Sequence, residues 1–441
     1  MPSRPELAVL LYFAVAACVF AAVVPVFEAP DEPFHLGYVN FLLEHRSLPN
    51  QLDENHRVFR EGHQPPLFYA LAAVWTVPFR GGAPVEVDIA RNPRHDLGGG
   101  RQRDVPYFLH PPDGPFPTRG DRGAFYALRG LGIALGLVTL CFTFGIARVF
   151  LPDERWVWVP GALLASLPQF VFVCSSLNSD NLANALAAAG IYLALRWFEE
   201  PKRRRHALWL GVVFGLGIAT KKTMLTLLPP LALAIAWLLA KRADLRMRLI
   251  GNAGVALTTM VAIGGWVYLR NRALYGDLLG TEMEKATLAF IVHEQGLLSA
   301  YFRSTFWSAT CISFVGLFGW MQIRLPGLLY VAYWCVLAAG LLAAALSLLR
   351  DGDRRSVSLL AAGFGMSSLA GLIYFNTTFP EPQGRYLFPV VSLMAVLVVF
   401  GLRSLADRVP GLWPARAVRV ALPVLGVVAD ALSLLRIRGF Y

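Results

Sequence analysis

A motif of seven residues at positions 29–35 carries the side chains that are most suited to chemistry. It reads Ala-Pro-Asp-Glu-Pro-Phe-His and places two adjacent carboxylates, Asp31 and Glu32, one helical turn before His35. A carboxylate held near a hydroxyl group can remove its proton and act as a general base. The simpler interpretation is that Asp31 caps a helix and that Glu32 lies in its first turn. Capping and catalysis are compatible, so both stay open. We assign Asp31 and Glu32 to catalysis and His35 to substrate binding.

The same spacing would allow Asp31, Glu32 and His35 to share one helix face and hold a divalent metal. Two or three ligands without a second cluster make a weak metal site. The sequence therefore predicts no firmly bound metal, and these three residues remain the weak candidates for one.

A second motif, Glu-Gly-His-Gln-Pro-Pro-Leu at positions 61–67, ends one element and begins another, because the proline pair breaks regular structure. His63 and Gln64 are the polar groups at this corner. They are suited to donate hydrogen bonds to a sugar or a phosphate. The alternative is an ordinary helix start.

Two cationic motifs follow in apolar surroundings. Lys221 and Lys222 separate two apolar blocks, and Arg385 lies between Gln383 and Tyr386. Lysine at a helix end often extends to the membrane interface without binding anything. A phosphate would equally satisfy these cations, and the arginine fork suits a bidentate contact. We assign all five residues to substrate binding.

Two further acids lie close to apolar blocks. Asp180, in the sequence Asn-Ser-Asp-Asn, starts a helix and is assigned to substrate binding, although helix capping is the favoured explanation. Asp430 lies within an apolar stretch near the carboxyl terminus, where it would be paired or face a pore. The sequence suggests no role for it.

The elements that must hold these residues are membrane-spanning helices. Of the 441 residues 56% are apolar and 16% are charged, whereas soluble proteins carry about a quarter charged residues. The apolar residues form uncharged blocks, most of which reach the roughly 18–20 residues that a helix needs to cross a bilayer. They predict an all-α integral membrane protein with about eleven (roughly 10–13) transmembrane helices. The blocks are 7–27, 130–147, 156–179, 223–240, 249–269, 325–349, 356–380 and 386–402, with weaker ones at 181–195, 206–220 and 420–435.

The basic residues fix the expected orientation. The net charge is +11, and lysine and arginine concentrate in short connections between apolar blocks, near residues 202–205, 241–248, 350–355 and 403–419. This is the positive-inside pattern, which places such connections in the cytoplasm and argues against nucleic acid as a partner. The amino terminus is then cytoplasmic, and the motif at residues 29–35 faces the periplasm or the cell exterior. We expect the protein in the inner (plasma) membrane.

A single polytopic membrane domain is expected over residues 1–441. It comprises a first transmembrane helix at 7–27, a large outer loop with interfacial helices at 28–127, and the remaining bundle at 128–441 with an outer loop at 271–325. The apolar segments 65–79 and 304–323 are ambiguous, because a full crossing by either would move basic connections to the outside. Half-inserted segments are tolerated where protein covers them or where they line a wet cavity, so two of them predict a cavity on the outer face.

Taken together, these motifs resemble a bacterial family of predicted membrane proteins of unknown function that is placed with the GT-C glycosyltransferases. The resemblance rests on Pro-Asp-Glu-Pro-Phe-His, His-Gln-Pro-Pro-Leu-Phe-Tyr-Ala-Leu, Asn-Ser-Asp-Asn, Thr-Lys-Lys-Thr and Gln-Gly-Arg-Tyr-Leu-Phe-Pro, in this order. The first two motifs are also similar to those of protein O-mannosyltransferases and lipid A aminoarabinose transferases. The resemblance implies a GT-C bundle with periplasmic juxtamembrane helices, a polyprenyl-phosphate-linked sugar as donor, and Asp31 as the base.

The reaction that this implies is transfer of the sugar to a hydroxyl of an extracytoplasmic glycan, lipid or protein, with inversion at the anomeric carbon. Because one phosphate would lie near both, Asp31 and Arg385 must share a cavity. A flippase or a transporter of lipid-linked sugars or another small solute is the alternative, since transporters also place charged groups within helical bundles.

Overall fold

Long apolar helices make up most of the chain in the computed structural model, which describes residues 2–95, 104–110, 121–350, 355–408 and 413–441. Within these ranges eight helices are long and apolar enough to cross a membrane, and a ninth span results if the bent pair α5 and α6 counts as one. The eight are α1 (Arg4–Val23), α4 (Asp121–Phe150), α9 (Leu228–Lys241) with the 3-10 helix η1 (Lys222–Leu227), α10 (Arg246–Met260) with α11 (Trp266–Tyr275), α14 (Gly327–Arg350), α15 (Arg355–Asn376), α16 (Val391–Ala406) with the 3-10 helix η6 (Gly384–Val390), and α17 (Trp413–Phe440).

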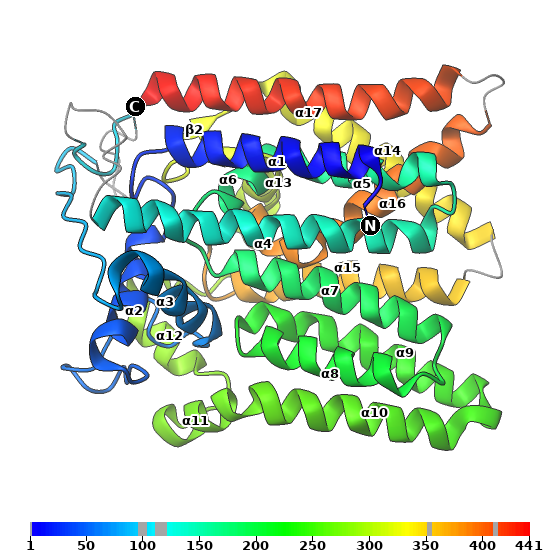
Figure 1. The fold of residues 1–441 in the computed structure, drawn as a ribbon, viewed down its shortest axis with the longest axis horizontal. Helices are drawn as coiled ribbons and strands as arrows, with labels where there is room; N and C mark the ends of the chain where they lie inside the picture. Colours follow the sequence, from blue (N-terminus) through cyan, green and yellow to red (C-terminus); the bar gives the residue numbers. More distant parts are fainter. Residues whose placement is uncertain (1, 96–103, 111–120, 351–354, 409–412) are drawn as a thin grey trace.

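Two more helices run in the same bundle. α7 (Asp180–Glu199) and α8 (Arg204–Ile218) lie side by side between α4 and α10 (Figure 1). The bent pair consists of α5 (Glu154–Ala165) and α6 (Pro168–Cys174), which meet at 70°. The all-α membrane architecture follows the expectation, whereas the count of about eleven spans stays a prediction.

The first helix shows why these segments form a membrane bundle. Its inner face packs against α4 and α5 and is apolar, and its outer face is apolar as well. A helix that is apolar all round belongs either in a large core or in a bilayer. Apart from Glu6 near its start, the buried side chains are apolar and include Val9, Phe13, Ala17 and Phe20, and the exposed side chains include Leu7, Leu11, Val15 and Val19.

The two ambiguous apolar segments form short elements. Residues 67–80 form α3 (Leu67–Arg80), whose 14 residues extend about 21 Å, less than the roughly 30 Å of a bilayer core. The second segment forms the π-helical turn η5 (Tyr301–Phe306) and α13 (Trp307–Val315), followed by a two-stranded hairpin, β1 (Leu317–Phe318) and β2 (Ile323–Arg324). Neither is among the candidate spans, so half-insertion stays the prediction for both.

The two ends of the bundle carry different elements. The short helices α2 (Glu32–His45), α3 and α12 (Thr281–Thr287) gather at one end, together with the carboxyl terminus (Figure 1). The connections between α7 and α8 and between α9 and α10, which hold two of the basic clusters, lie at the opposite end, where α14 and α16 also end (Figure 1). The helices α2, α3 and α12 therefore lie at the same end of the bundle as the motif at residues 29–35.

Candidate functional site

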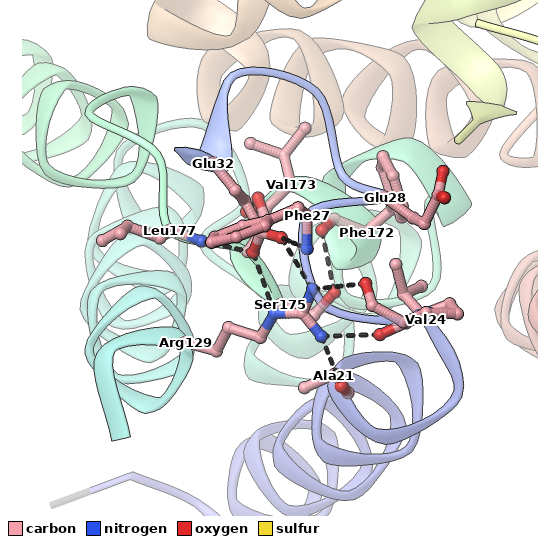
Figure 2. Close-up of polar contacts among 12 residues, drawn as sticks. Ala21, Val24, Phe27, Glu28, Glu32, Arg129, Phe172, Val173, Ser175 and Leu177 are labelled. Atoms are coloured by element: carbon pink, nitrogen blue, oxygen red, sulfur yellow. Dashed lines mark hydrogen bonds and ion pairs between the residues drawn. The ribbon is translucent and has the colours of Figure 1, made fainter. Parts of the chain in front are cut away.

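A buried ion pair holds the backbone that leads from α1 into α2. Arg129 of α4 donates to both carboxylate oxygens of Glu32, at 2.8 and 2.7 Å, and neither residue is exposed to solvent. The same guanidinium donates to the carbonyl oxygens of Ala21, Val24 and Pro25 (Figure 2). Backbone amides of Phe27 and Leu177 complete the coordination of the Glu32 carboxylate.

Glu32 does not line the cavity described below, and its carboxylate is held in the Arg129 network, where it stabilises the loop. Its assignment to catalysis stays a prediction. Asp31 precedes it with a φ of 71°, in the left-handed region that non-glycine residues rarely adopt. Such a strained residue persists only where its surroundings hold it, and here the Glu32 contacts do so.

A cavity of about 350 Å³ opens beside Asp31. It is enclosed by α2, the loop at residues 60–64, η1, α12, α15 and η6. Its wall carries charged side chains and also apolar ones, among them Leu225, Leu288, Ile291, Leu372 and Phe375. The residues assigned from sequence that line it are Asp31, His35, His63, Gln64, Lys221, Lys222, Arg385 and Tyr386, whereas Glu32, Asp180 and Gln383 do not.

The expected meeting of Asp31 and Arg385 takes place in this cavity. An Nη atom of Arg385 donates to the Asp31 carboxylate at 2.6 Å, across 354 positions of sequence. Burial alone would raise the pKa of Asp31, but Arg385, His35 and Arg60 together outweigh it and hold the pKa below its ordinary value. Asp31 is therefore ionised at neutral pH.

Each of the two lysines has a carboxylate partner. Lys221 donates to Asp180 at 2.5 Å, and Lys222 donates to Glu284 of α12 at 2.6 Å. His63 lies 3.5 Å from the other oxygen of Glu284. Burial acts against ionisation of Glu284, but His63 and Lys222 prevail and lower its pKa to about 2. Asp180 thus meets the site through Lys221, although it lies outside the cavity wall.

Three acids of this region escaped the sequence assignment. Glu61 and Glu381 line the cavity with Glu284. Burial, followed by the charge of Asp31, raises the pKa of Glu61 to about 7, and the same two causes raise the pKa of Glu381. Glu61 could have been assigned to the site from sequence, because it lies within the second motif. Nothing in the local sequence marks Glu284 or Glu381.

Several buried polar atoms around the cavity have no hydrogen-bond partner among the described residues. Buried polar groups are normally paired, so unpaired ones on a cavity wall indicate a polar ligand. Two of these atoms are guanidinium nitrogens, on Arg60 and Arg385, and two are hydroxyl oxygens, on Thr223 and Ser368. The atoms are Nε of Arg60, Nε of Arg385, Nδ1 of His63, Oγ1 of Thr223 and Oγ of Ser368.

The weak metal candidates do not converge. Asp31 faces Arg385 and Glu32 faces Arg129, so each carboxylate is neutralised by an arginine. Within the ranges that the structure describes, no three histidine, cysteine, aspartate or glutamate side chains come together as a metal site would require.

Comparison with known proteins identifies the family of the chain and its fold. The family model described as Predicted membrane protein (DUF2142) matches residues 114–394, well over half of the chain. No curated protein sequence matches the chain.

Among solved structures, the chain is similar to ArnT from Cupriavidus metallidurans bound to undecaprenyl phosphate, with 12% identity and a TM-score of 0.57 over 99% of this chain and 75% of that one. It is also similar to the Archaeoglobus fulgidus oligosaccharyltransferase in the apo form, with 12% identity and a TM-score of 0.56 over 99% of this chain and 56% of that one. The archaeal oligosaccharyltransferase AglB, in complex with an inhibitory peptide and a dolichol-phosphate, gives 14% identity and a TM-score of 0.55 over 97% and 56%. These similarities show the fold, which is that of the GT-C glycosyltransferases.

Proposed function

The chain belongs to the DUF2142 family of predicted membrane proteins, and we propose that it is a glycosyltransferase that takes a sugar from a polyprenyl-phosphate donor. The acceptor is a hydroxyl group of an extracytoplasmic glycan, lipid or protein. The observation that carries the proposal is the contact between Asp31 and Arg385 at the wall of one cavity that is lined by both charged and apolar side chains.

The cavity wall has side chains that suit both the phosphate and the polyprenyl chain of such a donor. The basic side chains of Arg385, Lys221 and Lys222 suit the phosphate, since charge-assisted hydrogen bonds to phosphate are strong. The apolar wall near Leu372 and Phe375 suits the first isoprene units. Two proteins of the same fold support this choice, because ArnT was solved with undecaprenyl phosphate and AglB with dolichol-phosphate.

The proposed reaction is a single displacement. Asp31 takes the proton of the acceptor hydroxyl, the acceptor oxygen bonds to the anomeric carbon, and the bond from that carbon to the phosphate oxygen breaks. The lipid phosphate leaves with the electron pair and needs cations rather than an acid, and Arg385 and the two lysines supply them. One displacement inverts the anomeric configuration.

Helices α2 and α12, which contribute residues to the cavity wall, lie at the end of the bundle opposite the connections between α7 and α8 and between α9 and α10 (Figure 1). By the positive-inside rule, those connections are cytoplasmic. The site would then open on the periplasmic or outer face of the plasma membrane, where lipid-linked sugars present their headgroups after translocation.

The test is transfer by the purified protein, in lipid bilayers, from a panel of polyprenyl-phosphate sugars to envelope extracts. Lipid analysis of a deletion strain identifies the donor, which should accumulate. Asp31→Asn should lower the transfer rate about 10²–10⁴-fold, the range of general base catalysis. Asp88→Asn, at an exposed position of the same outer loop, is the matched control and should transfer normally.

Undiminished transfer by Asp31→Asn would remove Asp31 as the base. Absence of transfer from every donor by the wild-type protein would overturn the proposed function. Movement of an intact lipid-linked sugar across the bilayer, without a new glycosidic bond, would instead identify a flippase.

A further inference from the structure

A chain of hydrogen bonds leads from the cavity to a second carboxylate. The Tyr69 hydroxyl of α3 donates to Glu61 at 3.0 Å, and Nδ1 of His35 lies 3.1 Å from the same hydroxyl oxygen. His35 is one helical turn after Asp31, its backbone amide donates to the Asp31 carbonyl, and both side chains line the cavity. We propose that Glu61 is the final acceptor of the proton that the acceptor hydroxyl loses, and that this proton travels through His35 and Tyr69. The inference rests on the proposed function.

The hydrogen-bond directions set the starting state of this relay. Because the Tyr69 proton is directed to Glu61, Nδ1 of His35 must be the donor toward the Tyr69 oxygen. Nε2 of the ring then carries a lone pair. Burial above all lowers the pKa of His35 to about 4, so the ring is neutral at neutral pH and can accept a proton at Nε2 while it gives one up at Nδ1.

The transfers balance without any further reactant. The acceptor proton moves to Asp31 as the new glycosidic bond forms and the phosphate leaves. A water molecule in the cavity carries the proton from Asp31 to Nε2 of His35, because no direct contact joins these two side chains. Nδ1 of His35 passes its own proton to the Tyr69 oxygen, and Tyr69 passes its hydroxyl proton to Glu61. The net change is one proton moved to Glu61 and a switch of His35 to its Nε2–H tautomer, and Asp31 is again an anion beside Arg385.

The direction of transfer follows from the two carboxyl environments. Arg385 keeps Asp31 acidic, whereas burial and the charge of Asp31 raise the pKa of Glu61 to about 7. Two carboxyl groups whose environments separate their pKa values commonly divide proton-transfer roles. The Glu61 side chain is 15% exposed, so it can release the proton to water in the cavity.

The charged and titratable groups that face Glu61 come from four elements besides its own loop. Asp31 raises its pKa, while Lys221, the Tyr69 hydrogen bond and Arg385 lower it. Glu61 must be ionised at the start of each turnover, because its carboxylate accepts the Tyr69 proton. The turnover rate of the wild-type protein should therefore rise with pH through about 7 and then level off.

The experiment measures kcat and donor KM between about pH 5 and 9 for wild type, Glu61→Gln, Glu61→Asp and Tyr69→Phe. Glu61→Gln should lower kcat about 10–100-fold, leave donor KM within about twofold, and abolish the rise near neutral pH. Tyr69→Phe keeps the ring but breaks the relay, and should lower kcat by a similar factor. Glu61→Asp should restore part of the rise. Glu54→Gln, exposed in the same loop, is the matched control.

A second readout does not need catalysis. Infrared difference spectra of the folded protein should show a carboxyl group that deprotonates near neutral pH and is missing from Glu61→Gln. A missing band, or a Glu61→Gln variant with the wild-type rate and pH profile, overturns the relay while transfer itself stands. If the wild-type protein transfers no sugar at all, the proposed function fails, and the infrared titration still decides the state of Glu61.

Discussion

Removing the Arg129 guanidinium should both destabilise the bundle and misplace Asp31. Arg129→Met keeps an apolar side chain of similar length but deletes five hydrogen bonds, two to Glu32 and three to carbonyl oxygens between α1 and α2. Glu32 would remain a fully buried carboxylate with only two backbone amides. Breaking one partner of a buried ion pair costs about 3–5 kcal/mol, because the other charge is left uncompensated.

Removing both charges of the Glu32–Arg129 pair should lower the free energy of unfolding less than removing the Arg129 charge alone. In the double variant Glu32→Gln with Arg129→Met no buried charge remains, so we expect a coupling energy of about 2–3 kcal/mol between the two sites. Arg155→Met provides the contrast, because Arg155 pairs with Asp153 at 3.0 Å while its side chain is 73% exposed. Exposed pairs of this kind contribute little to stability, because water screens both charges.

The assay is reversible unfolding of the protein in mixed micelles, followed by circular dichroism, with transfer measured on the same samples. The free energy of unfolding should fall most for Arg129→Met, less for the double variant and least for Arg155→Met. Transfer should be lost in Arg129→Met even under conditions where it remains folded, because Asp31 loses its fixed position. If Arg129→Met unfolds within about 1 kcal/mol of wild type, or if the two changes simply add, the buried pair does not hold this loop.

Two further predictions concern the cations of the cavity. Arg385→Ala should lower kcat/KM for the lipid donor about 10–100-fold, as expected for losing a charged hydrogen bond to phosphate, and donor titration with unchanged affinity would contradict this. His63 and Lys222 outweigh burial and hold the pKa of Glu284 at about 2, below its ordinary 4.5. Ionised Glu284 therefore stabilises the fold above about pH 4.5, and this stabilisation is lost as the pH falls toward 2. Lys222→Met should raise that pKa and move the acid loss of stability to higher pH, which unfolding measured as a function of pH would show.

The sequence was most informative about the transmembrane helices. Uncharged blocks predicted the spans, because a helix that must cross hydrocarbon cannot carry unpaired charge. The basic residues of the short connections then located one end of the bundle. Arg385 and Asp31 were expected to share a cavity because one donor phosphate would lie near both, and the two side chains lie 2.6 Å apart.

The pairing of charges across the bundle was not predictable in the same way. Lys221, Lys222 and Glu32 each meet a partner on another element, Asp180, Glu284 and Arg129. Such pairs depend on how helices rotate and pack, which hydropathy and spacing do not encode. Glu32 shows the consequence, since it looked equivalent to Asp31 in sequence.

The paired state of the cations changes how a donor can bind. Arg385, Lys221 and Lys222 are already neutralised by Asp31, Asp180 and Glu284, so a phosphate must compete with a carboxylate rather than occupy a free positive site. When the phosphate takes over Arg385, Asp31 loses the charge that keeps its pKa low, and its affinity for a proton increases. Donor binding would therefore activate the base, and an acceptor hydroxyl arriving first would meet an Asp31 too acidic to remove its proton.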